Sequence, residues 1–276
     1  MLESLQRLFD ERAGTPGVHL SNSRWLSVWR PNIRMVDRYR TGRIFLAGDA
    51  AHVHSAAGGQ GLNTGVQDAY NLGWKLAAVL HGAPDALLDT YQAERLPVAE
   101  GVLSTTSIRH REFQRDFSQA VNTLIAGKET FADPSQLSIT YRGSRLSRDL
   151  DDTTGIRAGD RASDAACVRA QSGEHVRLFD LFRGTHFTLL VFGDQPVPQL
   201  PAVYDGSVHT YTIALPENTV ALTEHLLVDR DGQAHRAYGI TGSALILVRP
   251  DGYIGLTGGS PGQEPIIDYL REVTGA

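Results

Sequence analysis

The sequence predicts an α/β (α+β) fold, and two stretches lead to that prediction. Residues 42–80 contain a short apolar strand, a glycine-rich turn and a segment with helical spacing of apolar residues. From about residue 167 onward, short β-rich runs alternate with helical segments, which is typical of a small mixed sheet with flanking helices. A chain of 276 residues with 41% apolar residues can build one large domain or two ordinary ones.

The first half of the chain predicts mainly helices. The leucine spacing indicates an amphipathic helix over Leu2–Arg12, and Val18–Val28 is expected to form a strand. A helix from Leu62 to Leu80 has apolar residues at three- and four-residue steps, which predicts one apolar stripe across about five turns. Asp68 and Asn71 are placed on or beside its polar face. A second helix starts near Pro84-Asp85 and should bend or break at Pro97, because proline lacks the N–H donor.

The second half predicts a polar linker followed by strands. Residues 143–164 are rich in aspartate and glycine and are expected to form the linker. The β-rich runs are His186–Phe192, Val208–Ala214 and Leu245–Arg249. Pro250-Asp251-Gly252 is a tight turn that leads into Tyr253–Leu256 as the hairpin partner of the third run.

Composition and charge narrow the function classes. The net charge of −5 and the absence of a lysine or arginine cluster argue against a nucleic-acid partner. No apolar run approaches the ~20 residues needed to span a bilayer, and the acidic N-terminus lacks a signal-peptide pattern. We therefore expect a cytoplasmic protein without a membrane partner. The single cysteine, Cys167, excludes an intrachain disulfide, and a small buried residue is favoured over a reactive thiol.

The glycine-rich stretch offers two kinds of ligand-binding group. Arg43–Ala47 is the expected strand, and Gly48-Asp49 ends it, which places a carboxylate at the strand end. Free backbone N–H groups at the following helix N-terminus suit an anion or the electron-rich edge of a ligand, and a carboxylate suits a hydroxyl donor. Alternatively, the glycines only supply left-handed backbone angles or close packing. His52 and His54 lack a third ligand at metal-binding spacing, so no metal site is expected.

The ordered motifs around this stretch resemble a known family. They are Gly48-Asp49-Ala50-Ala51-His52, Gly58-Gly59-Gln60-Gly61-Leu62-Asn63-Thr64-Gly65, Asp68-Ala69, Asn71-Leu72-Gly73-Trp74-Lys75-Leu76 and Tyr91-x-x-Glu94-Arg95-x-Pro97. This string resembles the second flavin-binding motif of the FAD-dependent aromatic hydroxylases, the para-hydroxybenzoate hydroxylase-like flavoprotein monooxygenases. In particular, it resembles the branch of this family that acts on polyketides and phenols. The resemblance implies hydroxylation of an aromatic or polyketide substrate, with FAD as cofactor and NADPH as reductant.

The resemblance also implies roles for particular residues. Backbone N–H groups of Leu62 and Asn63 would face the N1/O2 edge of the flavin, and Asp49 would bind the ribityl or pyrophosphate region. The cofactor-binding residues implied are Gly48, Asp49, Ala50, Gly59, Gln60, Gly61, Leu62 and Asn63. Trp25 and Met35 would face the aromatic substrate. The chain departs from the family where it has alanine at 56 and 57, since proline is common in that neighbourhood and would stiffen the loop. No catalytic residue is identified.

Part of the family's pattern is absent from these residues. Members begin with a βαβ unit carrying G-x-G-x-x-G, which binds the ADP half of FAD, and residues 1–41 contain only Gly14 and Gly17. The family's aspartate-glycine signature tied to NADPH is missing as well. We therefore expect only the riboflavin-facing half of the FAD site, in a truncated chain or beside a complementing subunit. The alternative is a non-catalytic ligand-binding or subunit-association protein derived from such a hydroxylase.

The resemblance suggests a division into three parts. Residues 1–41 would be a remnant of the substrate-binding sheet, and residues 42–150 the C-terminal part of the FAD-binding domain. Residues 151–276 would form a thioredoxin-like domain, because Ala234–Gly239 and Gly242–Gly252 resemble that domain of the same hydroxylase branch. It has no C-x-x-C motif, which excludes thiol redox chemistry. Its expected role is packing or subunit association, for example in a homodimer.

Overall fold

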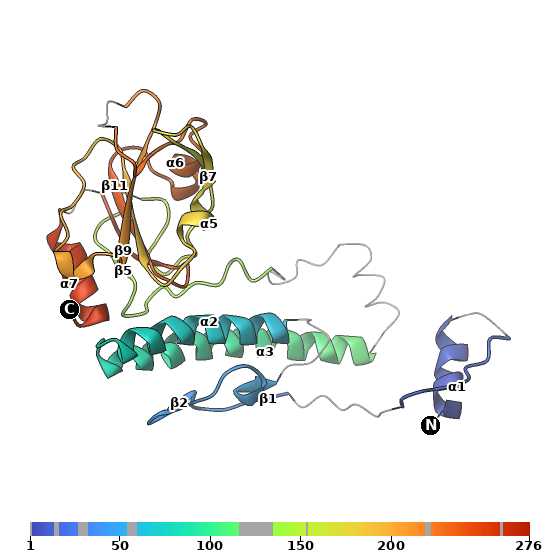
Figure 1. Cartoon of the computed structure of the whole chain (residues 1–276). Helices are drawn as coiled ribbons and strands as arrows, with labels where there is room; N and C mark the ends of the chain where they lie inside the picture. Colours follow the sequence, from blue (N-terminus) through green and yellow to red (C-terminus); the bar gives the residue numbers. More distant parts are fainter. Residues whose placement is uncertain are drawn as a thin grey trace. The chain divides into compact units, whose positions relative to one another are not determined.

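A computed structural model describes most of the chain. The described residues are 2–13, 17–26, 33–53, 60–115, 135–152, 154–218, 222–259 and 262–276, with side chains omitted for 105–115. The chain divides into two compact units, Met1–Asn32 and Ile33–Ala276. Figure 1 shows their elements coloured along the sequence.

The first unit contains one helix followed by an irregular segment. Helix α1 (Leu2–Ala13) confirms the predicted helix. The strand predicted for Val18–Val28 is wrong over residues 18–26, where the backbone forms no strand, and residues 27–28 lie outside the described part. The reason is local, because the Gln6 amide donates to Val18 O at 2.8 Å and accepts from Leu20 N at 2.7 Å. A side chain of α1 therefore binds the backbone groups that a neighbouring strand would bind.

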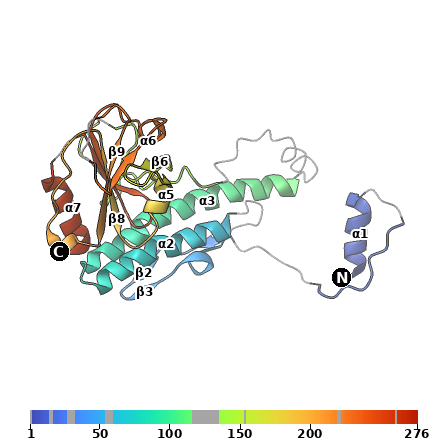
Figure 2. The ribbon, with the colours of Figure 1, turned by 45° about the horizontal axis from the view of Figure 1, so that its top comes forward.

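The second unit begins with two short β-ladders and a helix pair. Strand β1 (Arg34–Met35) pairs antiparallel with β4 (His52–Val53), and β2 (Arg40–Thr41) pairs antiparallel with β3 (Ile44–Phe45). The turn η1 (Gly48–Ala50) lies between β3 and β4. Helix α2 (Gly61–Leu80) is followed by the short η3 (Asp85–Leu88) and the long α3 (Asp89–Arg115). Figure 2 shows α2 and α3 side by side.

Helix α2 has the predicted length, but its apolar stripe is exposed and its polar face is buried. Leu62, Val66 and Tyr70 of the predicted apolar stripe are 80%, 59% and 57% exposed, so these side chains do not lie in the core. The buried side chains of α2 are instead mostly polar or charged: Thr64, Asp68, Asn71, Leu72, Trp74 and Lys75. The spacing of apolar residues does not predict the buried face of this helix. The buried polar groups bind partners on other elements, which removes most of the cost of burying them.

Helix α3 continues through its proline. Of the predicted bend or break at Pro97, the break is wrong, because the helix runs from Asp89 to Arg115. The bend stays a prediction. Glu94, Arg95 and Ala99 on either side of Pro97 are buried, and their contacts hold both halves of the helix in place. Tertiary packing therefore offsets the missing N–H donor.

The C-terminal part is a mixed eight-stranded sheet in the order β5-β12-β11-β8-β9-β10-β6-β7. Strands β8, β9 and β10 run parallel, and β11 and β12 form an antiparallel hairpin beside β8. The strands are β5 (Arg148–Asp149), β6 (Ala166–Arg169), β7 (His175–Arg177), β8 (Phe187–Phe192), β9 (Val208–Ala214), β10 (Leu226–Val228), β11 (Ala244–Val248) and β12 (Ile254–Gly258). The remaining elements are α5 (Leu178–Leu181), η4 (Ala202–Tyr204), α6 (Gln233–Tyr238) and α7 (Glu264–Thr274).

Helices cover both faces of this sheet. Alternate residues of β8 and β11 point to opposite sides, as the two-residue period of a strand requires. Leu190 and Ile246 pack in a cluster with residues of α5 and α6, whereas Leu189 and Leu245 pack with residues of α7. Figure 1 shows α7 on one side of the sheet and α5 and α6 on the other. The three predicted β-rich runs and the hairpin turn are confirmed, as is the burial of Cys167, which raises its pKa to about 12.

The segment predicted as a polar linker belongs to this part of the fold. Strand β5 pairs with β12, and Leu146, Ile156 and Ala158 are buried, so the linker interpretation is wrong. Its polar residues hold turns in place: Asp149 Oδ1 accepts from Ala158 N at 2.8 Å. Among the described residues, no helix is both long and apolar enough to cross a membrane.

Candidate functional site

The turn at Gly48 is packed directly against the start of α2. Gly48 has a φ of +57°, a left-handed conformation that favours glycine. A Cβ placed on Gly65 would lie 3.1 Å from Gly48 Cα, so position 65 needs the space that glycine leaves. The structural role that the sequence left open for the glycines therefore holds at these two positions, and it brings the turn beside the first turns of the helix.

The carboxylate of Asp68 holds this turn in place through hydrogen bonds. Its buried Oδ2 accepts the Gly48 amide at 3.1 Å and lies 2.6 Å from His52 Nε2, and its Oδ1 accepts Arg95 Nε at 2.7 Å. Burial raises the pKa of Asp68, but the hydrogen bond from His52 and the charge of Arg95 lower it by more, so the group stays ionised. The sequence placed Asp68 on the polar face of the helix and missed this role.

The N-terminus of α2 has backbone donors available. Gln60 is the N-cap residue, and its side chain makes no capping hydrogen bond. The first intrahelical bond runs from Thr64 N to Gln60 O at 3.0 Å, so the N–H groups of residues 61–63 have no acceptor within the helix. The side chains of Leu62 and Asn63 are exposed, which leaves this end of the helix open. These are the donors that the sequence predicted.

The carboxylate of the motif lies in the adjoining turn. Asp49 and Ala50 are both exposed in η1, next to Gly48. The turn is closed by a hydrogen bond from Ala51 N to Gly48 O at 2.8 Å. An exposed acceptor and a row of N–H donors therefore border one region, which has a positive helix end on one side. Gly59, His54 and the alanines at 56 and 57 lie outside the described residues.

The two predicted substrate contacts lie in different units. Trp25 is in the first unit and is 85% exposed. Met35 in β1 is half-buried and packs against a cluster that includes Tyr39 and Tyr91. Their substrate roles stay predictions.

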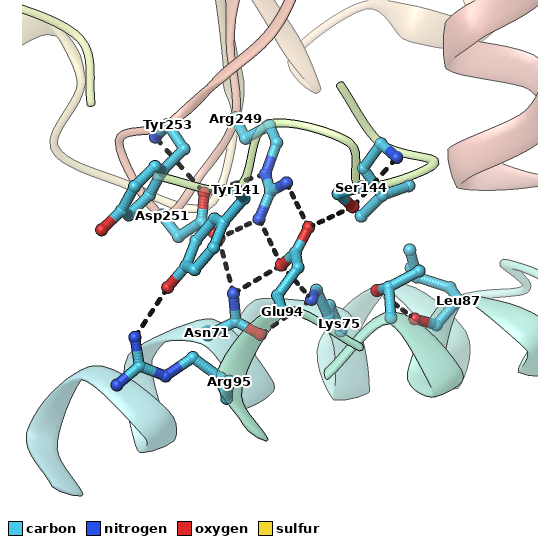
Figure 3. Close-up of polar contacts among 12 residues, drawn as sticks. Asn71, Lys75, Leu87, Glu94, Arg95, Tyr141, Ser144, Arg249, Asp251 and Tyr253 are labelled. Atoms are coloured by element: carbon cyan, nitrogen blue, oxygen red, sulfur yellow. Dashed lines mark hydrogen bonds and ion pairs between the residues drawn. The ribbon is translucent and has the colours of Figure 1, made fainter. Parts of the chain in front are cut away.

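A second polar cluster lies between the helix pair and the turn that joins β11 to β12 (Figure 3). Glu94 is at its centre. Its two oxygens accept Arg249 Nη1 and Nη2 at 2.7 and 3.0 Å, and Oε2 also accepts Lys75 Nζ at 2.7 Å. Asn71 and Ser144 each donate to Glu94 at 2.7 Å.

The cluster is closed by an aspartate of the hairpin turn. Asp251 Oδ2 accepts Arg249 Nη2 at 2.5 Å and Trp74 Nε1 at 2.9 Å. Burial lowers the pKa of Lys75 to about 8, although the charge of Glu94 raises it in part. The pKa of Glu94 falls well below its usual range, because the charges of Arg249 and Lys75 outweigh the effect of burial. We call Asn71, Trp74, Lys75, Glu94, Ser144, Arg249 and Asp251 the ionic cluster.

Two protein families match this chain. Residues 2–106 match the family described as FAD binding domain, and residues 156–276 match the family described as Aromatic-ring hydroxylase, C-terminal. Together these matches cover the candidate site and every strand of the C-terminal sheet except β5. The chain belongs to the FAD-dependent aromatic-ring hydroxylases.

Similar hydroxylases have been described in sequence and in structure. A flavin-dependent monooxygenase of Mycobacteroides abscessus is 45% identical over 276 residues, which are 99% of this chain and 49% of that protein. Pentachlorophenol 4-monooxygenase of Sphingobium chlorophenolicum is 37% identical over 85% of this chain and 46% of its own length. Aklavinone-11 hydroxylase in complex with FAD and aklavinone has a TM-score of 0.73 at 28% identity, over 100% of this chain and 51% of that one.

An anhydrotetracycline hydroxylase of Streptomyces rimosus has a TM-score of 0.70 at 33% identity, over 100% of this chain and 53% of its own. These comparisons confirm the family resemblance and the α/β fold class. The chain spans about half the length of the hydroxylases that it matches.

The residues present fit the flavin end of FAD. The close approach of Gly48 to Gly65 leaves no side chain between the turn and the helix end. The open N–H groups of α2 suit the electron-rich edge of the ring system, and exposed Asp49 suits a hydroxyl of the ribityl chain.

Proposed function

We propose that this chain supplies the riboflavin-facing half of an FAD site in an enzyme that hydroxylates an aromatic or polyketide substrate, with NADPH as reductant. One observation carries the proposal: the three backbone N–H groups that have no acceptor within α2 lie at the start of this helix, beside the turn that presents Asp49. The names of similar hydroxylases, which include pentachlorophenol and aklavinone, support a phenolic or polycyclic substrate.

The proposed role of each residue follows from the charge or hydrogen-bonding group that it would offer to the flavin. FAD, when bound, supplies the electron transfer and oxygen activation that hydroxylation needs. The N–H groups of Leu62 and Asn63 would donate to the N1/O2 edge of the flavin, where reduction adds negative charge. Asp49 would accept a hydrogen bond from the ribityl chain. Gly48, Ala50 and Gln60 would shape the backbone around them.

The proposal extends to the division of the chain. Residues 1–41 would contribute to the substrate side with Trp25 and Met35, residues 42–150 to the flavin side, and residues 151–276 would form the thioredoxin-like domain. A second role, association with a complementing polypeptide, is favoured by the exposed stripe of Leu62, Val66 and Tyr70. Apolar side chains gathered on one helix face are typical of a surface that another segment covers.

Titration of flavin tests the site directly. FMN and FAD would be added to the 276-residue chain while flavin fluorescence is followed. We expect both to bind with similar affinity, because the described residues contact only the half that the two molecules share. If neither flavin is bound or quenched, an autonomous flavin site is excluded.

Replacing Asp49 tests the residue. Asp49→Ala should weaken flavin binding by about 1 to 3 kcal/mol, since a ligand hydroxyl would lose its acceptor. Asp37→Ala is the matched control, because Asp37 is also an exposed aspartate in the same part of the chain but lies outside the turn. Equal affinities for the wild type and Asp49→Ala would place the ligand elsewhere.

A further inference from the structure

Adjacent residues of α3 connect two buried clusters. Glu94 belongs to the ionic cluster, where its carboxylate binds the Arg249 guanidinium through two hydrogen bonds of 2.7 and 3.0 Å. Arg95, the next residue, turns to the other side and donates to Asp68 at 2.7 Å. One peptide unit therefore joins the hairpin turn of the C-terminal sheet to the carboxylate that holds Gly48.

Tyr141 provides a second connection between the same clusters. Its hydroxyl accepts Arg95 Nη1 at 3.0 Å, and the Arg249 guanidinium lies 5.5 Å from the centre of its ring. The ring also packs on Tyr253 of the hairpin, with centroids 4.1 Å apart. Figure 3 shows Tyr141 between Arg249 and Arg95. A shift of the hairpin turn would therefore disturb Arg95 by two routes.

The side chains along these routes are buried, which makes the connection stiff. Asp68, Arg95 and Arg249 have at most 1% of their surface exposed. A buried charge that loses its partner is strongly unfavourable, so these groups cannot separate and rebind water as surface ion pairs do. The arrangement therefore allows few alternatives to the observed position of Asp68.

Asp68 ends the connection at the backbone of the candidate site. Its Oδ2 accepts the amide of Gly48 at 3.1 Å, immediately before Asp49. We propose that Arg249 is a positioning residue for the flavin-binding turn, acting on Asp68 through Glu94, Tyr141 and Arg95. The C-terminal part of the chain thus takes part in shaping a turn that is held by hydrogen bonds from other elements. The proposal rests on the proposed function, which makes this turn a flavin-binding turn.

Amide hydrogen exchange of the flavin-free chain tests the connection. Arg249→Met removes the charge and both hydrogen bonds to Glu94. For each amide we compare the exchange rate in the variant with that in wild type. We expect this ratio to be at least about tenfold larger at residues 48–51 than at the β8 amides, because local opening of the turn sets the exchange rate. Arg249→Lys retains the charge and should restore part of the protection.

Two controls separate positioning from general loss of stability. Arg142→Met removes an exposed arginine that pairs with Asp160, and exchange at residues 48–51 should not change. Leu190→Ala destabilises the sheet core and should affect β8 at least as much as the turn. Equal acceleration everywhere in Arg249→Met, or no acceleration at residues 48–51, would overturn the proposal.

If Arg249→Met does not fold, Tyr141→Phe decides the question. This variant keeps the ring and removes only the hydroxyl that accepts Arg95. We expect selectively faster exchange at residues 48–51, and unchanged exchange there would overturn the proposal. Because no flavin is added, a failed flavin titration leaves this result intact, and a negative exchange result leaves the flavin site itself untouched.

Discussion

The C-terminal sheet and the contact between the helix pair and the β11–β12 turn are both buried, but they are built from different groups. All six residues of β8, Phe187–Phe192, are buried and all but Thr188 are apolar. The contact with the helices instead buries Lys75, Glu94 and Arg249, each with at most 4% of its surface exposed. The first region gains stability from apolar area removed from water, which is not directional. The second depends on the geometry of individual hydrogen bonds.

This difference explains why the two regions are suited to different tasks. Apolar cores tolerate substitutions that preserve volume, because many small contacts share the energy. A buried ionic cluster contributes little net stability when intact, but it disfavours other arrangements because each would leave a charge unpaired. We expect the sheet to provide stability and the ionic cluster to fix the position of α2 and α3.

Removal of Glu94 should produce the largest effect. Glu94→Ala leaves Arg249 with only Asp251 and Lys75 with only Asn71, which should lower the free energy of unfolding by about 3 to 5 kcal/mol. Leu190→Ala in the sheet should cost about 2 to 5 kcal/mol through loss of apolar contacts and a cavity. Urea unfolding at neutral pH measures both. A cost below about 1 kcal/mol for Glu94→Ala would show that water replaces the lost charge and that the cluster is not rigid.

The sequence predicted the apolar region far better than the ionic one. Alternating or continuous apolar residues located β8, β9 and β11 to within one residue, because a strand's burial follows its local pattern. The ionic cluster joins Glu94 to Arg249, which are 155 residues apart, and no local pattern records such a pairing. Without those partners, the sequence placed Asp68 and Asn71 only on or beside the polar face of the helix.

The candidate site was also predicted only in part. The family resemblance predicted residues 48–50 and 59–63 as cofactor-binding residues, and the structure places those that it describes in the η1 turn and at the start of α2. The sequence did not predict that Asp68 and Arg95 hold these residues in place, because both act through tertiary contacts. Val18 and Pro97 show the same limit: a side chain of α1 binds the backbone of the first, and packing offsets the missing donor of the second.

Acid should lower the stability that the buried carboxylates Asp68 and Glu94 contribute. The pKa values of Asp68 and Glu94 are lowered in the folded protein, so the unfolded chain binds more protons as the pH falls. Their contribution is present above the ordinary carboxylate pKa values of about 4 and is lost progressively below them. Urea unfolding at a series of pH values should show this loss, and Asp68→Asn and Glu94→Gln should each reduce the slope. Identical slopes in wild type and both variants would contradict the lowered pKa values.

The exposed face of α2 should give the smallest effect. Val66 is 59% exposed, whereas Leu72 on the same helix is 8% exposed. Val66→Gln adds a residue that favours helix, so the free energy of unfolding should change by less than about 0.5 kcal/mol. Leu72→Gln buries an amide in the cluster of Tyr39 and Tyr91 and should cost about 1 to 3 kcal/mol. A cost for Val66→Gln as large as that for Leu72→Gln would mean that another polypeptide or a second copy of the chain covers this face in solution, and concentration-dependent unfolding would then distinguish the second copy.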